Sequence, residues 1–347
     1  MAFTDDWLAL TTEETLEPDL KICDPHHHLW DAGFDPSAKF RSEQVEGRYL
    51  LDEILAEVNS GHNVTSTVFI ECMSMYRADG LAHLRPVGET EFVNGIAAMS
   101  ASGRYGPCRI AAGIVGLTDM NLGSGAREVL EAHISAGAGR FRGIRHAASW
   151  DASEDIRNSH TKPTQHMLAD VKFREGIAQL APLNLSFEAW CYHPQIPDAT
   201  DLAQAFPNTT IILNHFGGPL GIGPYAGKRE ETFAQWRLDI SNLAKCQNVV
   251  AKLGGINMRV NGFDWDLGEK PPSSEELAAA TRAYYDHCIE VFGPDRCMFE
   301  SNFPVDKRTC SYNVLWNTFK RIASGCSNSE KAALFHDTAA RVYRLDS

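Results

Sequence analysis

The sequence lacks several features that mark common protein classes. Its nine cysteines are odd in number and scattered, and no two form a Cys-x-x-Cys pair, so we predict reduced, mostly buried thiols with no zinc or nucleophile role. No apolar run approaches the roughly 18 residues that a membrane-spanning helix needs. The N-terminus carries Asp5 and Asp6 where a secretory signal would carry basic residues. We therefore expect a cytoplasmic protein without a membrane partner.

Runs of basic residues are also missing. The 347 residues include 45 acidic and 32 basic side chains, which gives a formal net charge of −13. Such a chain repels phosphate backbones, so nucleic acid is not an expected partner. With 44% hydrophobic and 22% charged residues, the chain can bury a large core and is not expected to be disordered. A small molecule is the expected ligand, and the sequence leaves a homo-oligomer open.

Strand-like and helical patterns alternate along the chain. Eight strand-like runs are expected over residues 20–28, 64–71, 109–116, 141–146, 184–190, 210–215, 248–253 and 297–301. Segments with helical spacing lie between and after them, over 50–59, 89–101, 126–136, 172–181, 198–206, 229–244, 274–292 and 312–322. Because parallel strands need a crossover of a dozen or more residues, this alternation predicts parallel βαβ units.

Eight such units favour an α/β fold with a single closed (β/α)8 barrel of the TIM type over an open sheet. The runs 68–70 and 211–213 are apolar without polar alternation, as in strands covered on both faces. An open doubly wound sheet usually has a Gly-rich phosphate turn after its first strand. At that position this chain has the glycine-free sequence Asp-Pro-His-His-His (24–28). We predict a polar N-terminal arm over residues 1–20 and one barrel domain, with a C-terminal helix, over 21–347.

Polar side chains gather where the predicted strands end, and barrels of this kind form their active sites there. The first strand ends in Asp24, His26 and His28, which have the same parity and therefore share one face. Candidates at later strand ends are Arg142, Arg145 and His146 on the fourth, Glu188 and His193 on the fifth, His215 on the sixth, Lys252 on the seventh, and Glu300 and Asn302 on the eighth.

His26 and His28 can bring two imidazoles to one ion or one substrate oxygen, a geometry that suits a first-row metal. The pair alone is common in ordinary strands, but its place at a strand end, together with His215, favours function over packing. Hydrogen-bonded packing is the favoured interpretation for His146. For His193, packing and substrate binding are equally weighted.

Four motifs at these strand ends resemble the amidohydrolase superfamily: DPHHHLWD (24–31), FRGIRH (141–146), HFGGP (215–219) and FESNFPVD (299–306). Within it they resemble the amidohydrolase-2 branch that includes sugar-lactone and pyrone-dicarboxylate lactonases. The resemblance spans nearly the whole predicted barrel. It implies a distorted (β/α)8 barrel, hydrolysis by an activated water, and an aspartate at the end of strand eight that takes the proton of that water.

The resemblance also assigns roles to residues. His26, His28 and His215 would bind one divalent ion, with zinc favoured, or would polarise a lactone carbonyl directly, since some members of the branch work without an ion. Arg142 and Arg145 would lie where the branch holds substrate carboxylates. The strand-four lysine or carboxylate that bridges two metals in other amidohydrolases has no counterpart in this chain, which argues against a binuclear site.

One residue departs from the family pattern. Asn302 stands in the place of the strand-eight aspartate, and an amide does not take a proton near neutral pH. Glu300 has the same parity and lies one pleat deeper, so it is the nearest substitute base; His193 and Asp306 are others. A buried ion pair between Glu300 and a base such as Lys252 is an equally weighted structural interpretation.

The remaining candidates would face the substrate. Lys252 in the barrel mouth suggests ion pairing or substrate binding, whereas a Schiff-base role would require a desolvated amine. Trp30 and Trp190 lie just past strand ends, where they would line a flat pocket for a ring or cover the core. Because basic residues and histidines gather at the mouth, a small anionic substrate is compatible with an acidic chain.

These observations support three hypotheses. The first is hydrolysis of a lactone of a small carboxylated or hydroxylated acid, with His26, His28 and His215 at the carbonyl. The second is a metal-dependent nonoxidative decarboxylation or amide hydrolysis on the same barrel. The third, suggested by Asn302, is a barrel that has lost catalysis and binds a small acid.

Overall fold

A parallel sheet of eight strands forms the centre of the molecule in the computed structural model, which describes residues 5–31 and 47–345. In sheet order the strands are β1 (Lys21–His27), β4 (Asn63–Ile70), β5 (Arg109–Gly116), β6 (Phe141–Arg145), β7 (Ser186–Ala189), β8 (Ile211–Leu213), β9 (Val249–Leu253) and β10 (Cys297–Phe299). Each strand pairs in parallel with the next along the chain, as the alternating pattern predicts.

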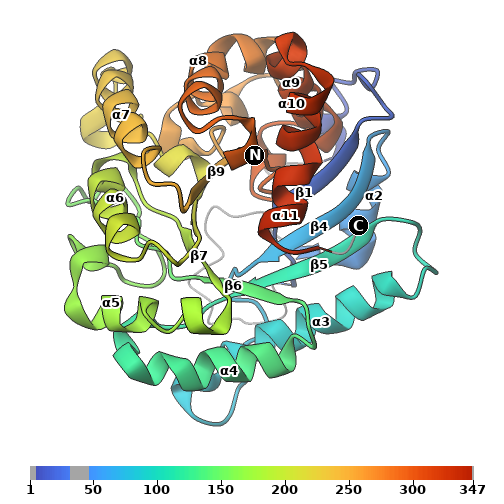
Figure 1. The fold of residues 1–347 in the computed structure, drawn as a ribbon. Helices are drawn as coiled ribbons and strands as arrows, with labels where there is room; N and C mark the ends of the chain where they lie inside the picture. Colours follow the sequence, from blue (N-terminus) through green and yellow to red (C-terminus); the bar gives the residue numbers. More distant parts are fainter. Residues whose placement is uncertain (1–4, 32–46, 346–347) are drawn as a thin grey trace.

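Helices surround the strands in a ring (Figure 1). The helices that follow the strands in turn are α2 (Leu51–Val58), α3 (Val87–Ala101), α4 (Ala126–Ala136), α5 (Val171–Ile177), α6 (Ile196–Ala205), α7 (Arg229–Leu243), α8 (Ser274–Phe292) and α9 (Tyr312–Ile322). Capping residues explain some of the boundaries: Ser273 accepts a hydrogen bond from the backbone of Glu276, whose side chain returns to Ser273 and starts α8.

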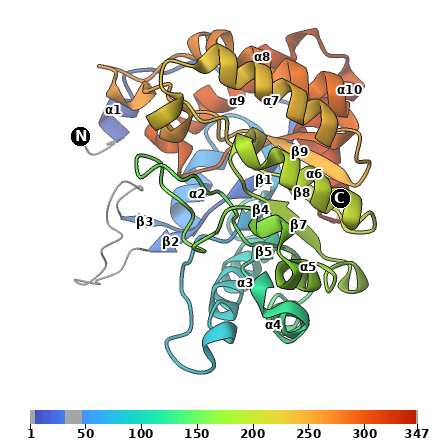
Figure 2. The same ribbon diagram turned by 90° about the vertical axis from the view of Figure 1, so that its left-hand side faces the viewer.

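Shorter elements complete the fold. They are α1 (Asp5–Leu8), α10 (Asn328–Ala332), α11 (Thr338–Val342) and an antiparallel pair formed by β2 (Trp30–Asp31) and β3 (Arg48–Tyr49). The sequence pattern did not predict α1 or the β2–β3 pair, which lies beside α2 (Figure 2). No described helix is long and apolar enough to cross a membrane.

The first and last strands close the sheet just beyond their ends. The amide of His28 donates to the carbonyl oxygen of Phe303 at 2.8 Å, and the amide of Asn302 donates to that of His26 at 2.9 Å. His27 and Phe303 form an isolated parallel bridge. Register shifts between β1 and β4, β4 and β5, and β5 and β6 distort the cylinder. The fold is therefore the predicted (β/α)8 barrel.

Apolar side chains fill the barrel at the end opposite the carboxyl ends of the strands, and they also fill the shell between strands and helices. Val68, Ile70, Val115, Ile212, Val250 and Met298 pack inside the barrel against Val342 and Tyr343 of the C-terminal segment. A larger core lies between the strands and the helices, with Trp236 and Trp316 fully buried in it. Charged residues follow the apolar layer toward the carboxyl ends of the strands, and these build the site.

The N-terminal arm is fixed to the outside of the barrel over its described part. Nζ of Lys320 donates to the carbonyl oxygens of Leu16 and Glu17 at 2.7 and 2.9 Å. The carboxylate of Glu13 accepts a 2.7 Å hydrogen bond from the amide of Ser274, at the start of α8. Residues 1–4 of the predicted arm lie outside the described residues.

Candidate active site

A cavity of about 400 Å³ opens where the carboxyl ends of the barrel strands meet. Its buried polar lining includes His28, Arg145, His215 and Asn302, and its aromatic lining consists of Trp30, Trp190 and Tyr192. The segment between β6 and α5 adds Ser149, Arg157, Asn158, Ser159 and His160. The cavity lies at the end of the barrel at which the sequence predicts a site.

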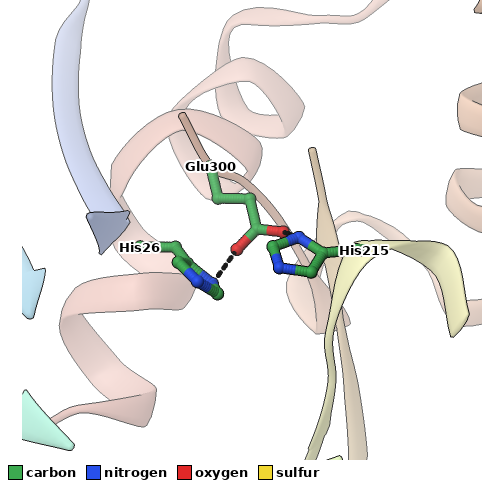
Figure 3. A group of neighbouring side chains, drawn as sticks. All are labelled: His26, His215 and Glu300. Carbon is green, nitrogen blue, oxygen red and sulfur yellow. Dashed lines mark ion pairs between the residues drawn. The ribbon is translucent and has the colours of Figure 1, made fainter. Parts of the chain in front are cut away.

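Glu300 occupies the centre of this site. It follows β10, is fully buried, and holds its carboxylate between two histidine rings (Figure 3). Oε2 lies 2.6 Å from Nδ1 of His26, and Oε1 lies 2.7 Å from Nδ1 of His215. The two ring centroids are 4.5 Å apart. Of the substitutes proposed for the missing aspartate, Glu300 is the one that contacts the predicted histidines.

The local backbone brings these side chains together. His215 and Asn302 have φ of +51° and +56°, a left-handed conformation that is uncommon outside glycine and clusters at functional sites. After β9, two glycines leave the space that the site needs. A Cβ on Gly255 would lie 2.3 Å from Nδ1 of His215, and one on Gly254 would lie 2.5 Å from Cγ of Glu300. Only glycine permits this approach.

Two cations approach His26. Nη1 of Arg145 lies 3.3 Å from its Nε2, and Nζ of Lys252 lies 3.4 Å from its Nδ1. A neutral imidazole accepts one hydrogen bond, so only one of these approaches is a hydrogen bond at a time. Burial, reinforced by Lys252, holds the pKa of His26 well below its usual value, and the ring is therefore neutral at pH 7.

Lys252 lies beneath the cavity rather than in its lining. It is fully buried, and its Nζ is 3.0 Å from Oε2 of Glu188 and 4.0 Å from Oε2 of Glu300. Glu188 also accepts hydrogen bonds from the hydroxyl of Tyr343 and the amide of Asn214. Of the two roles predicted for Lys252, the structure shows ion pairing, and the side chain does not line the cavity.

His26, His215 and Glu300 form a group that can hold a metal ion, with one donor atom from each within 4.8 Å of the others. Among the described residues, Nδ1 of His215 and both oxygens of Glu300 lack a hydrogen-bond partner of good geometry despite the short distances. Buried lone pairs that converge in this way suit a cation, and nitrogen with carboxylate oxygen suits zinc or manganese. The donor set therefore fits one divalent ion, although the charges of Arg145 and Lys252 oppose it.

His28, predicted as a third metal ligand, stands outside this group. Its Nδ1 lies 2.8 Å from the carbonyl oxygen of Ile70, and because a carbonyl only accepts, that nitrogen carries the proton. Burial, reinforced by Arg145, holds the pKa of His28 well below its usual value. The ring stacks against Trp30 with centroids 6.0 Å apart and lines the cavity, where it can contact a substrate.

Two residues predicted to bind substrate lie elsewhere. Arg142 is at the end of β6 away from the cavity, where its guanidinium donates to the carbonyl oxygens of Tyr343 and Gly139 at 2.5 and 2.6 Å. His193 accepts a 3.2 Å hydrogen bond from the amide of Leu220, and burial lowers its pKa to about 4. The prediction for Arg142 is wrong, because its guanidinium is bound outside the cavity. For His193 the contact with Leu220 matches the packing interpretation, and the side chain does not line the cavity.

Asn302 lines the cavity, and Asp306 lies behind it. Nδ2 of Asn302 is 3.5 Å from Oδ1 of Asp306, whose side chain is buried. Burial and the neighbouring charge of Glu300 raise the pKa of Asp306 well above its usual value, so this carboxyl is neutral. A neutral carboxyl does not accept a proton from water, which removes Asp306 from the candidate bases.

Two residues of the site escaped the sequence analysis. Glu71 follows β4, is fully buried, and holds Oε1 2.8 Å from Nε of Arg145. His160 approaches Oε2 of Glu71 at 3.4 Å and lines the cavity. Glu71 ends a predicted strand, which was a usable signal. His160 lies in a segment without periodicity, so no sequence pattern indicates its role.

The match to known proteins covers nearly all of the chain. The model of the amidohydrolase family matches residues 23–345. The chain belongs to the amidohydrolase family. This amidohydrolase is 33% identical over 337 residues to the uncharacterized protein y4mH of Sinorhizobium fredii, covering 94% of this chain and 99% of that one. It is 29% identical over 239 residues to the L-fucono-1,5-lactonase of Burkholderia multivorans, covering 68% and 72%.

Solved structures of other amidohydrolases share the fold. An amidohydrolase from Burkholderia multivorans with bound zinc superposes with a TM-score of 0.70 at 23% identity, covering 94% of this chain and 99% of that one. The 5-carboxyvanillate decarboxylase from Novosphingobium aromaticivorans, complexed with manganese and a nitrobenzoic acid, gives a TM-score of 0.58 at 13% identity, covering 96% and 98%. At these identities the likeness shows the fold, and it confirms the predicted amidohydrolase-type barrel.

Proposed function

We propose that this amidohydrolase opens a lactone of a small hydroxylated or carboxylated acid with an activated water. The observation that carries the proposal is the carboxylate of Glu300, buried between His26 and His215 beside the cavity. It supplies the negative charge that Asn302 lacks. Trp30 and Trp190 give the cavity flat aromatic surfaces, which suit a ring.

His215 is placed to act as the general base. Its Nδ1 faces Glu300 and its ring lines the cavity, so the second ring nitrogen is directed away from the carboxylate (Figure 3). In this role Glu300 would hold the imidazole in one orientation and stabilise its protonated form after it takes a proton from water. General-base catalysis of this kind is typically worth about 10² to 10⁴ in rate.

Arg145 is placed to assist the carbonyl. Three of its five N–H groups are used by Glu71 and His26, which leaves two for a ligand at the edge that lines the cavity. A donor fixed in this way would stabilise the oxyanion that forms when water attacks, a contribution of about 3 to 4 kcal/mol. A divalent ion held by His26, His215 and Glu300 would supply Lewis-acid polarisation and a more acidic water.

A panel of lactones tests the proposal. Aldono-1,4- and 1,5-lactones, muconolactone and 2-pyrone-4,6-dicarboxylate would be incubated with the purified protein, and acid release would be followed with a pH indicator. We expect saturable turnover of at least one lactone, and turnover that survives chelation if His215 is the base. Failure of the folded protein to open any of them contradicts the proposal.

A second candidate function is a metal-dependent decarboxylase or amidase. The orphaned lone pairs of His215 and Glu300 favour it, because such reactions need a tightly held ion. Elemental analysis of wild type and His215→Ala distinguishes the two. A stoichiometric ion that is lost in the variant, with activity abolished by chelation, supports this candidate, whereas a metal-free active protein excludes it.

A further inference from the structure

We propose that Glu71 sets the charge specificity of the cavity: by neutralising Arg145, it makes the site select lactones that carry hydroxyl groups and no carboxylate. The inference rests on the proposed lactone hydrolysis and names the class of substrate. It departs from the expectation that Arg142 and Arg145 together clamp an acid group.

The contacts of Arg145 carry the inference. Its Nε lies 2.8 Å from Oε1 of Glu71, and its Nη2 donates to the backbone oxygen of the same residue at 2.5 Å. One residue thus occupies the fork that would otherwise grip a carboxylate in bidentate fashion. The N–H groups that remain can still donate to hydroxyl or carbonyl oxygens, which need no opposite charge.

Glu71 is held rigidly in this role. Its amide donates to the carbonyl oxygen of Val115 at 2.9 Å, and its side chain is fully buried. Nε2 of His160 lies 3.4 Å from the second carboxylate oxygen, Oε2. Burial opposes ionisation, but Arg145 and His160 together hold the pKa of Glu71 below its usual value, so the carboxylate is charged at pH 7.

The remaining buried charges around the cavity do not favour an anion. Lys252 is paired with Glu188 beneath the lining, and Glu300 adds a further carboxylate. Apart from the histidines, the buried ionisable groups Arg145, Lys252, Glu71, Glu188 and Glu300 carry two positive and three negative formal charges. Arg157 also lines the cavity, but it is exposed to solvent, where its charge is screened. A site without a net positive charge also releases the acid that lactone opening produces.

Exchange of Glu71 for glutamine tests this inference. The probes are D-galactono-1,4-lactone and D-galactaro-1,4-lactone, which differ in a hydroxymethyl group and a carboxylate at C6. Wild type is expected to prefer the neutral lactone, and Glu71→Gln is expected to shift the ratio of the two kcat/KM values toward the carboxylated lactone by about tenfold or more. An unchanged ratio overturns the inference.

A matched control is the neighbouring buried acid Glu89. Its Oε1 accepts hydrogen bonds from the amides of Cys72 and Ser74, and burial raises its pKa to about 8. Because this carboxyl is already mostly neutral at pH 7, Glu89→Gln should leave the ratio unchanged. A shift as large as that of Glu71→Gln would show that any change in this region alters selectivity, and would overturn the specific role of Glu71.

A binding measurement separates this inference from the proposed reaction. Galactarate, which has no ring to open, would be titrated while tryptophan fluorescence is followed, since Trp30 and Trp190 line the cavity. We expect Glu71→Gln to bind it about tenfold more tightly than wild type. If wild type opens neither lactone, the proposed function fails while this titration still decides the role of Glu71.

A measurement on the wild-type protein keeps the test valid if Glu71→Gln does not fold. If Glu71 has already neutralised Arg145, galactitol, the uncharged polyol of the same chain length, should bind at least as tightly as galactarate. Galactarate binding that is about tenfold or more tighter than galactitol binding would show that the wild-type site attracts carboxylates, and would overturn the inference.

Discussion

Arg142 and Arg145 stand three residues apart on β6, yet they act at opposite ends of the barrel. Arg142 donates to carbonyl oxygens at the base, including that of Tyr343 in the C-terminal segment. Arg145 contacts a carboxylate and a histidine side chain at the mouth. At the base, the guanidinium of Arg142 thus binds backbone carbonyl oxygens. At the mouth, charged side chains contact one another beside the cavity.

The two ends differ in backbone as well as in charge. At the mouth, His215 and Asn302 have left-handed backbone conformations, and Gly254 and Gly255 leave space for the side chains of the site. At the base, apolar side chains pack around Tyr343. Strain and buried charge cost stability and persist where function needs them. Changes at the mouth should therefore affect rate more than stability, and changes at the base should do the reverse.

The largest effect is expected at the centre of the mouth. Glu300→Gln keeps the size of the side chain but removes the charge that orients His215, so kcat/KM for the best lactone should fall about 10³-fold. Steady-state kinetics with a folded variant, checked by circular dichroism, measures this. Asp306→Asn is the matched control, because that carboxyl is already neutral, and its kcat/KM should stay within a few-fold. Equal losses in both variants would contradict the assignment.

A smaller but still large effect is expected from Gly255→Ala. The new Cβ would lie 2.3 Å from Nδ1 of His215, so the ring must move, and a displacement near 1 Å typically costs about 10² in rate. Gly293→Ala shares the positive φ, here +79°, but its Cβ meets no atom within 4 Å. It should lower stability without lowering kcat/KM. A similar rate loss in both would mean that backbone strain, not the position of His215, is responsible.

At the base, Arg142→Ala should destabilise the protein without affecting catalysis. The variant loses charge-assisted hydrogen bonds to Tyr343 and Gly139, which predicts a fall of about 2 kcal/mol in the free energy of unfolding. Urea denaturation measures the fall, and kcat/KM should stay within about twofold. A large rise in KM with unchanged stability would restore Arg142 to the substrate site and break the comparison.

The smallest effect is expected in the helical shell. Nδ1 of His133 on α4 accepts from the hydroxyl of Thr90, Nε2 donates to the carbonyl oxygen of Leu117, and burial lowers its pKa to about 4. In the unfolded state the pKa of His133 is near 6.5, so between about pH 6.5 and 4 the unfolded state binds more protons than the folded state. The contribution of His133 to the free energy of unfolding is therefore fully present above about pH 6.5 and is lost as the pH falls toward 4.

Replacing His133 by glutamine tests that slope. Denaturant unfolding of wild type between pH 7 and 4.5 should show a steady loss of stability, and His133→Gln should show a shallower slope, smaller by up to one proton. Identical slopes in the two proteins would show that His133 does not contribute to the acid sensitivity.

The sequence predicted the strands and the residues at their carboxyl ends because both depend on local pattern. Apolar runs mark buried strands, and His26, His215 and Glu300 stand where those runs stop. Arg142 illustrates the limit of this reasoning. The C-terminal carbonyl oxygen of Tyr343 that binds its guanidinium is about 200 residues away in the chain, so no local pattern encodes this contact.

Contacts between distant segments explain the other differences. His193 was placed at a strand end, but its partner, the amide of Leu220, belongs to the next crossover. Glu71 and Arg145 come from neighbouring parts of the barrel that lie 74 residues apart in sequence, and no periodicity encodes their pairing. Their partnership bears directly on the expected substrate, because it turns a predicted carboxylate clamp into a neutral pair.

The central claim is that Glu300, rather than residue 302, provides the working carboxylate. The most direct test compares kcat/KM of wild type and Asn302→Asp on the same lactone under identical conditions. We expect an active wild-type protein and a change in kcat/KM of less than about threefold in the variant. An inactive wild type that gains lactonase activity through Asn302→Asp would contradict it, and would show that the barrel binds its ligand without catalysing the reaction.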